Sequence, residues 1–551
     1  MSVVDAIYQR MRDDTEIQAQ ETGESELAKF YSGLNVLVTG PSDMLGKCLV
    51  EKLLFDCSDL NTIYLLVRTK RGEDFHEKCK QFFGDDVFSR LRRSQPDFRK
   101  KIKAVKGDLS LDKLGLGDED YELLRENVDI ILHNGADTRL NGPVHESLRA
   151  NVLGTQRMLD LAAGCKHLKL FVQVSSAYAH CPWRVVEEVF YPAPADTRAV
   201  EDMIAADSET ASGLTRDALD MLLGDWPNVF VFGKAIAEDL VQRHALRAPY
   251  TCCVFRPSLV ISTYKEPIPG WCDHNNGPAS FFLKIAKGAI HVVYQSEYPL
   301  DLVPADLCAN ALLVSAWDAI DRWQTEPGAS VYNFGSSTEK PITMRQIKDK
   351  MMEDPQAFAT SNARRAPYVM MTGNMIVYLV LRFIFDYVPA FLIDLLTLLH
   401  GHPAQAWNLV RSSMTDMCRL VRLANGNYRV RVTESLKAYE RLNERDRALF
   451  FSDVRQLDWD DYFLTYWRGI RAHVLRESTD GPSSASFGCP FAAGRGSSSS
   501  SSSSSSSACP LGWAGSSSSC GRCPCKCPCK CVCLLAALAL LAYYLVGLLW
   551  R

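Results

Sequence analysis

The sequence predicts an α/β fold in which helices cover both faces of a doubly wound, parallel β-sheet, followed by a second, mainly helical part. Three observations predict it. Short apolar runs alternate with helical stretches from residue 34 onward, as expected for parallel strands buried on both faces. A glycine-containing loop follows the first apolar run, and the pattern changes near Thr343, where long apolar stretches begin. Apolar residues make up 47% and charged residues 23% of the 551 residues, which excludes a wholly disordered chain.

The first strand is expected at residues 36–38, where Val36, Leu37 and Val38 form a continuous apolar run. In the stretch that follows it, Leu45, Leu49, Leu53 and Leu54 share one helical face. Further strands are expected at residues 63–67, 102–105, 130–132, 170–174 and 252–255. Because helical stretches separate these strands, right-handed crossovers in an open, Rossmann-like sheet are predicted.

Five segments follow from these patterns. Residues 1–30 are a polar preamble, 31–345 the sheet domain, 346–480 a helical domain, 481–531 a Ser- and Cys-rich flexible linker, and 532–550 a transmembrane tail anchor. Residues 375–399 are very apolar, but Arg382, Asp386 and Asp394 argue against a second membrane span. Two helices broken near Pro389 are expected instead, either in the core of the helical domain or lying against the bilayer, and the core is favoured.

The tail anchor rests on 19 uncharged residues, which are enough to cross about 30 Å of hydrocarbon as a helix. Arg522, Lys526 and Lys530 precede the stretch, so its N-terminal flank and the body are expected in the cytosol. The anchor fits the endoplasmic reticulum or the peroxisome, and the two stay open. Alternating cysteines beside the stretch favour S-acylation over a metal site, and no metal ligands are predicted. The first 480 residues carry a net charge of −9, which argues against a nucleic-acid partner.

The loop after the first strand has the form of a dinucleotide-binding loop with one departure. Its candidate cofactor-binding residues are Thr39, Gly40, Ser42, Asp43, Met44, Leu45 and Gly46. Glycine at both ends allows a tight turn and close helix packing, with the helix N-terminus facing a diphosphate. Asp43 stands where the middle glycine would be. Its carboxylate would cap the helix and weaken anion binding at the same place.

Further cofactor-binding candidates lie where later strands end. Arg68, Lys70 and Arg71 follow the second strand and suit a 2′-phosphate, so NADPH is predicted over NADH, with a solvated basic loop as the alternative. Asp108 is placed to accept a hydrogen bond from an adenine amine. The small residues of the fourth-strand loop would lie near the cofactor, and they are Asn134, Gly135 and Ala136.

Several motifs in order resemble the alcohol-forming fatty acyl-CoA reductases of the extended short-chain dehydrogenase group. They are GDLSLDKLGL, ILHNGADTRLNGP, NVLGT, FVQVSSAYAHC, FRPSLVISTYKEPIPGW and LDLVPADLCANAL. The resemblance covers about residues 34–475 and includes that family's second domain. It implies reduction of a long-chain fatty acyl-CoA to a primary alcohol with two NADPH, and it adds Pro257, in FRPSLV, to the cofactor-binding candidates.

The resemblance also implies a catalytic set. A Tyr in Y-x-x-x-K would donate the proton, the Lys would hold the ribose and lower the Tyr pKa, and a Ser would hydrogen-bond the developing oxyanion. The Ser matches Ser176 and the Lys matches Lys234, but the Tyr position holds Phe230. Phenylalanine keeps the ring and has no proton to donate.

Two main hypotheses follow. The chain is an active reductase in which Ser176, a bound water or Tyr178 supplies the proton, or it is a pseudoenzyme that keeps an acyl-CoA pocket and acts as a membrane-tethered binding or regulatory protein. An aldehyde-releasing or carrier-linked reductase domain is a third option. The second domain and the membrane tail count against it.

Overall fold

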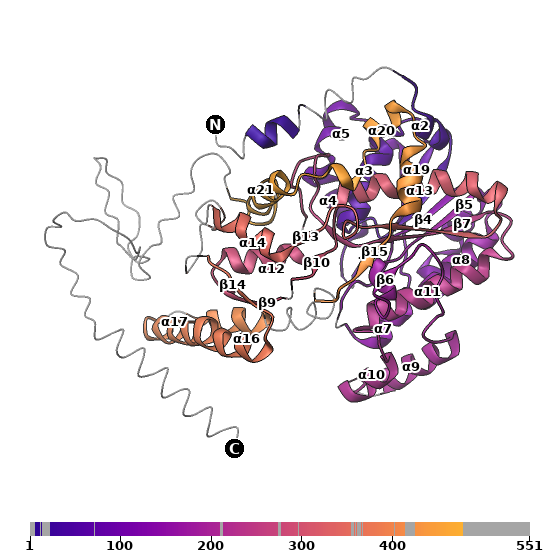
Figure 1. Cartoon of the computed structure of the whole chain (residues 1–551). Coiled ribbons are helices and arrows are strands. Elements are labelled where there is room, and N and C mark those ends of the chain that lie inside the picture. The colour runs from indigo at the N-terminus through magenta and orange to yellow at the C-terminus, as the bar shows by residue number, and fades with distance from the viewer. Residues whose placement is uncertain are drawn as a thin grey trace, which may run out of the picture.

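A parallel sheet of seven strands, ordered β12-β7-β5-β4-β1-β2-β3, forms the centre of the molecule in the computed structural model (Figure 1). The structure describes residues 6–477 apart from 12, 14–22, 71, 141, 210–212, 274–276, 296, 354–357, 359, 361–364, 366, 402 and 414–424. The strands of this sheet are β1 (Asn35–Thr39), β2 (Thr62–Val67), β3 (Ile102–Lys106), β4 (Ile130–His133), β5 (Leu170–Val174), β7 (Thr251–Pro257) and β12 (Ala329–Phe334).

The predicted doubly wound sheet is therefore confirmed, and each of the six expected strands is present within one or two residues of its predicted bounds. β12 was not predicted, and it extends the sheet by pairing with β7. The order reverses between β1 and β4, which pair directly. In such sheets ligands bind outside the carboxyl ends of the strands at the point of reversal.

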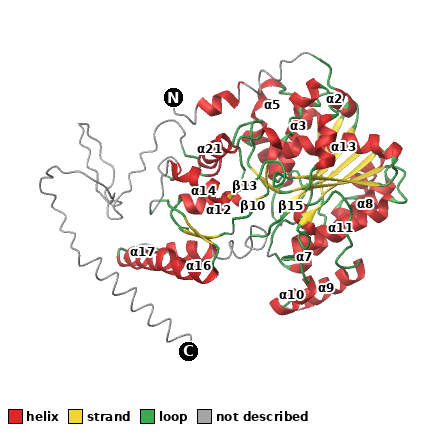
Figure 2. Cartoon of the chain, viewed as in Figure 1, coloured by secondary structure: helices red, strands yellow, loops and turns green. Residues whose placement is uncertain are grey.

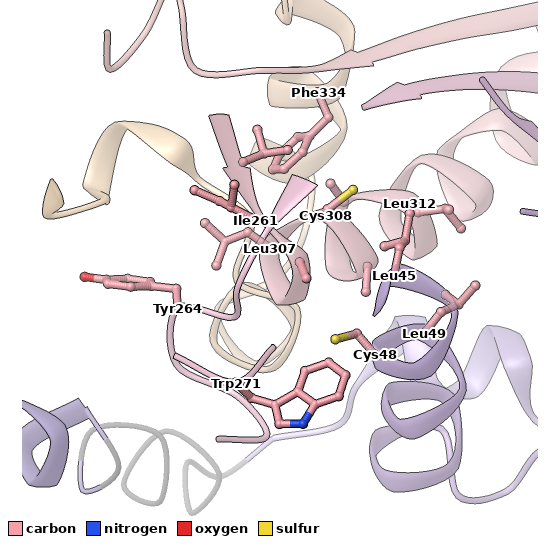
Figure 3. Close-up of a cluster of buried hydrophobic side chains, with 14 of the residues drawn as sticks. Leu45, Cys48, Leu49, Ile261, Tyr264, Trp271, Leu307, Cys308, Leu312 and Phe334 are labelled. Carbon is pink, nitrogen blue, oxygen red and sulfur yellow. The ribbon is translucent and has the colours of Figure 1, made fainter. Parts of the chain in front are cut away.

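Helices cover both faces of the sheet (Figure 2). On one face, α3 packs against α13, and the predicted leucines of α3 are buried there. Figure 3 shows Leu45, Cys48 and Leu49 of α3 facing Cys308 and Leu312 of α13. On the other face, α8 and α11 pack together in a second apolar cluster. The helices around the sheet are α2 (Glu26–Tyr31), α3 (Met44–Asp56), α4 (Phe75–Gly84), α5 (Ser89–Ser94), α6 (Asp118–Asn127), α7 (Val144–Leu148), α8 (Gly154–Gly164), α9 (Thr197–Glu209), α10 (Arg216–Leu223), α11 (Val229–Ala245) and α13 (Ala305–Thr325).

Short strand pairs and helices beyond the sheet's carboxyl edge form a second layer. The pairs are β8 (Leu259–Ile261) with β11 (Leu302–Pro304), β9 (Val292–Tyr294) with β14 (Met370–Thr372), and β10 (Pro299–Leu300) with β13 (Ile342–Thr343). The helices of this layer are α12 (Pro278–Ala286), α14 (Met344–Glu353) and α21 (Trp459–Gly469).

The chain after residue 345 returns to the sheet domain. β15 (Arg429–Val430) pairs with β6 (Val185–Val186), and α19 (Thr433–Glu440) packs on β12 and α13. α20 (Glu444–Leu449) follows, and Asp446 in it accepts backbone N–H bonds from α2. The predicted linker, the tail anchor, Arg71 and half of the preamble lie outside the described residues, and the predicted domain boundaries stay predictions.

The apolar stretch at residues 375–399 differs from its prediction in two ways. It forms one helical run, made of α16 (Met375–Arg382), a π-helical turn (Phe383–Tyr387) and α17 (Val388–Leu399), without a break at Pro389. Pro389 is accommodated because it falls in the first turn of α17, after the π turn. The favoured core placement is wrong, because only 22% of its most apolar window is buried.

Candidate functional site

A cavity of about 760 Å³ lies at the carboxyl ends of the central strands. Asn134 follows β4, Ser175 follows β5 and Pro257 ends β7, and all three line it together with the first turn of α3. The cavity therefore occupies the position where a doubly wound sheet binds its ligands.

The loop between β1 and α3 has the backbone of a dinucleotide-binding turn. Gly40 has φ +63°, and a Cβ there would lie 2.8 Å from the Cα of Gly135. A Cβ on Gly46 would lie 2.2 Å from the carbonyl oxygen of Gly40. Only glycine fits at either position, so the loop can bring its backbone close to a diphosphate.

Asp43 caps α3 and occupies the start of the helix. Its Oδ1 accepts a hydrogen bond from the Gly46 N–H at 2.6 Å, and Asn134 Nδ2 donates to both of its oxygens at 3.0 and 3.1 Å. Burial raises the pKa of Asp43 to about 6, against the lowering effect of these bonds and of Lys234 and Lys47. The carboxyl group therefore occupies the Gly46 N–H, a hydrogen-bond donor that a bound diphosphate would use. It is mostly charged at pH 7.

Lys234 projects from α11 into the cavity wall, and its side chain is buried. Its Nζ donates a hydrogen bond to the carbonyl oxygen of Val174 at 2.7 Å. Burial lowers the pKa of Lys234 to about 8, although Glu238 and Asp43 act to raise it. Phe230 lies one helical turn earlier, is half-buried and lines the same cavity. Ser176 also lines the cavity, and its hydroxyl accepts the Tyr178 N–H.

A buried polar network under Lys234 was not predicted. Arg256 donates to both oxygens of Glu238, His180 Nε2 lies 2.7 Å from Glu238 Oε2, and the Ser175 hydroxyl also bonds to Glu238. Although burial would raise it, Arg256 and His180 hold the pKa of Glu238 at about 2. The network fixes Ser175 beside Ser176 and places a carboxylate one turn beyond Lys234 on the same helix. No short motif joins these residues, so sequence reasoning had no signal for them.

Tyr178 lines the cavity, and its hydroxyl donates a hydrogen bond to the carbonyl oxygen of Asp301 at 3.4 Å. Burial raises the pKa of Tyr178 well above its ordinary value, so the group keeps its proton. The nearby Tyr428 ring meets it edge to face.

The far end of the cavity is apolar and comes from the second layer. Phe281 and Phe282 of α12, Val293 of β9 and Tyr466 of α21 line it. One cavity thus joins a polar end at α3 and Lys234 to an apolar end.

The cavity brings together nine of the predicted site residues, which are Asp43, Met44, Leu45, Asn134, Ala136, Ser176, Phe230, Lys234 and Pro257. Thr39, Gly40, Gly46 and Gly135 support its loop from behind, where the Thr39 hydroxyl accepts the Gly135 N–H.

Four other predicted residues lie away from the cavity lining. Ser42, Arg68 and Lys70 are exposed, and the backbone N–H of Lys70 donates to Glu73. Asp108 accepts bonds from the Ser110 N–H and hydroxyl.

Comparisons with known proteins agree with this architecture. Two family models, both described as male sterility protein, match residues 38–312, where the model is named for NAD binding, and residues 385–477. Human fatty acyl-CoA reductase 1 is 33% identical over 83% of this chain and 88% of its own length. The Drosophila melanogaster fatty acyl-CoA reductase wat is 32% identical over 85% and 89%.

Among solved structures, the reductase domain of a nonribosomal peptide synthetase from Mycobacterium tuberculosis is similar. Its TM-score is 0.53 at 17% identity, and the match covers 85% of this chain and 98% of that one. The terminal reductase domain of the myxalamid pathway gives 0.52 at 17%, with 84% and 97% covered. At these identities the likeness shows the fold.

Proposed function

Because this chain belongs to the fatty acyl-CoA reductase family, we propose that it reduces a fatty acyl-CoA thioester with a nicotinamide dinucleotide. The observation that carries the proposal is the single cavity with two chemically different ends. Lys234, Ser176 and the α3 loop line the polar end, and aromatic and aliphatic side chains line the other. A thioester carbonyl at the junction would place its acyl chain in the apolar end.

The residues present fit a dinucleotide with one conflict. The glycines of the β1–α3 loop and the start of α3 fit a diphosphate, and Lys234 fits the ribose next to the nicotinamide. Asp43 opposes the diphosphate while it is charged. Arg68 and Lys70 follow β2, where a 2′-phosphate would lie, and their exposure leaves both free to reach it. These charges support NADPH as the dinucleotide.

A bound reduced dinucleotide would supply hydride to the carbonyl carbon. The chain's own residues stabilise the oxygen: the Ser176 hydroxyl donates to it, and the Lys234 ammonium lowers the cost of its negative charge. In the first reduction the tetrahedral oxyanion collapses to an aldehyde and releases the CoA thiolate, which leaves without a proton. In the second, the alkoxide formed from the aldehyde must take a proton.

Because Phe230 has no hydroxyl to donate a proton, this second proton transfer is the slow step. We propose that the Tyr178 hydroxyl supplies the proton, because it lines the cavity and stays protonated. Its replacement proton would come from solvent. A less well placed acid favours escape of the aldehyde before the second reduction, so the alcohol should form slowly.

A second candidate function is favoured by Asp43 and Phe230 together. One occupies the diphosphate-binding turn, and the other removes the family's proton donor. A chain with both changes could keep the apolar end as an acyl-CoA binding site and transfer no hydride.

One assay separates the two functions. The purified full chain is incubated with palmitoyl-CoA and NADPH, and aldehyde, alcohol and free CoA are measured by mass spectrometry. The reductase proposal expects free CoA and NADPH consumption to rise together, with aldehyde as a substantial product. Binding of palmitoyl-CoA with no free CoA released would establish the binding function and overturn the reductase proposal.

We also propose that residues 532–550 anchor the chain in a membrane with its body in the cytosol, at the endoplasmic reticulum or the peroxisome. The uncharged stretch and its basic N-terminal flank support this topology. A glycosylation acceptor placed before residue 60 should stay unmodified when the full chain is made with endoplasmic reticulum membranes. Modification there would reverse the topology.

A further inference from the structure

The helical run from Met375 to Leu399 carries most of the exposed apolar surface of the described chain. Of the 20 large hydrophobic side chains exposed there, 11 lie in this run. We call its outer face, together with Trp407, the apolar ridge. The side chains that define it best are Ile376, Val380, Phe391, Leu398, Leu399 and Trp407. Ile376 and Leu399 are 75% and 74% exposed. Monomeric soluble proteins rarely expose an apolar patch of this extent.

The charged residues of the run point the other way, into the protein. Arg382 donates to Val410 O at 3.1 Å and Ser413 Oγ at 2.6 Å, and its side chain is buried. Asp394 is also buried and accepts the N–H groups of residues 405–407 at 2.8–2.9 Å. A helix in water shows the opposite pattern, with charges outward and apolar residues inward.

The body holds the first half of the run. Asp386 is fully buried and accepts the His291 N–H at 2.9 Å, and β14, just before α16, pairs with β9. The Tyr378 ring packs against Tyr294 of β9 with centroids 5.7 Å apart. Figure 1 shows α16 beside β9 and β14, with α17 continuing away from them at the lower left. With this half packed on the body and its charges turned into the protein, the run suits the plane of a bilayer surface better than a crossing of the bilayer.

The sequence after the described residues indicates what covers the apolar ridge. The 54 residues 478–531 lead to the uncharged stretch 532–550. A Gly- and Ser-rich linker of that length has a root-mean-square reach of about 40 Å. The proposed tail anchor would therefore keep the body within reach of the bilayer surface. Phe391 and Trp407 are side chains typical of the membrane interface.

We propose that the apolar ridge inserts into the interfacial region of a lipid bilayer, as a second membrane contact independent of the tail anchor. Val293 of β9 lines the apolar end of the cavity, and α16 packs on the same strand. Docking therefore turns the acyl end of the cavity toward the lipid. This last consequence rests on the proposed reductase function, whereas the docking rests on the exposed ridge and the proposed tail anchor.

The test uses the full chain with its tail disrupted by Leu541→Arg and Leu545→Arg. Flotation with phosphatidylcholine vesicles, with and without phosphatidylserine, measures binding in the absence of acyl-CoA and NADPH. The tail-disrupted chain should float. Adding Ile376→Glu and Leu399→Glu should lower the vesicle-bound to free ratio about tenfold or more, because two apolar side chains lose their burial. The matched control is Met221→Glu with Leu246→Glu, which changes two residues of similar exposure elsewhere and should have no effect.

Four results would overturn the proposal. The first two are that the tail-disrupted chain does not float, and that it floats equally well with the ridge substitutions. Binding could require phosphatidylserine and disappear in salt, which would make it electrostatic. The ridge substitutions could instead convert a dimer into a monomer in vesicle-free solution without changing flotation, which would assign the ridge to a second copy of the chain.

The consequence for the substrate has its own readout. With the reductase active, the ridge substitutions should slow reduction of palmitoyl-CoA presented on vesicles and leave a short, soluble acyl-CoA unaffected. An equal effect on both substrates would overturn the orientation. If neither substrate reacts, the proposed function fails while flotation still decides the docking.

Discussion

Phe230→Tyr should convert a slow, aldehyde-releasing enzyme into an efficient alcohol-forming one. Phe230 lines the cavity one turn before Lys234, so an added hydroxyl would face the cavity beside the ammonium group. With a Lys234 pKa of about 8, the ammonium form exceeds the amine about tenfold at pH 7 and would stabilise the tyrosinate left after proton transfer. A positioned general acid contributes about 10²–10⁴-fold, or about 3–5 kcal/mol of barrier.

Phe230→Tyr should increase the rates of the two reductions by different factors. The thioester step releases a thiolate without a proton, so it should gain only through the extra hydrogen bond to the oxyanion. The aldehyde step should gain the full general-acid effect. Single-turnover assays that start from palmitoyl-CoA or from hexadecanal, with products resolved by mass, measure each step separately.

Two variants serve as controls for this prediction. Phe230→Leu removes the ring without adding a hydroxyl and should give no gain. Phe230→Tyr combined with Lys234→Met should lose most of the gain, because no cation remains beside the hydroxyl. An unchanged hexadecanal rate in a folded Phe230→Tyr chain that binds NADPH would refute the reasoning.

Three other substitutions test the proposed dinucleotide contacts. Asp43→Asn should strengthen NADPH binding about tenfold at pH 8 through loss of like-charge repulsion. The substitution should have little effect at pH 5, below the raised pKa of about 6, because the carboxyl group is already neutral there. NADPH fluorescence titrations of both chains from pH 5 to pH 8 measure this difference. A difference in affinity that does not change with pH would contradict the prediction. Lys234→Ala should lower kcat/KM for NADPH oxidation at least about a hundredfold, and it should remove any fall in rate as pH rises through about 8, where the wild-type ammonium is lost. Arg68→Ala should reduce the preference for NADPH over NADH about tenfold or more, as compared by kcat/KM for the two dinucleotides, and an unchanged ratio would assign the 2′-phosphate to other residues.

The sheet was predictable because its strands are continuous apolar runs with helical stretches between them. β12 was not predicted because Ser330 and Asn333 interrupt its apolar pattern. In the structure Asn333 is buried, and its side chain donates to Val186 O and Arg431 O. Tertiary partners, which no local pattern reveals, make those polar residues acceptable in a strand.

The helical run at Met375–Leu399 shows the opposite failure. Its composition suggested a core helix, because high hydropathy alone does not say which surface covers a helix. The useful signal was the spacing of Arg382, Asp386 and Asp394, four and eight residues apart. That spacing puts all three charges on one helical face, and this face turned out to be the one against the protein.

The residues of the site could be predicted from sequence motifs, but the polar network around Lys234 could not. Asp43, Ser176, Phe230 and Lys234 come together because each lies at a strand end or in a helix turn that faces the same edge of the sheet. Glu238 and Arg256 could not be paired from sequence, since their contact depends on how α11 crosses β7.

The pairing of β15 with β6 has a practical consequence for dissecting the molecule. Glu188 of an early loop accepts the Glu434 N–H. In β12, the Asn333 side chain donates to Arg431 O and the Asn333 carbonyl accepts the Ser435 hydroxyl. A segment from near the C-terminal end of the fold thus completes the hydrogen bonding of both. Cutting the polypeptide at residue 345 would remove these partners from β12 and expose buried hydrogen-bond donors and acceptors to water. We therefore expect a fragment that ends at residue 345 to fold poorly, and recombinant fragments meant for crystallisation should run past Val474.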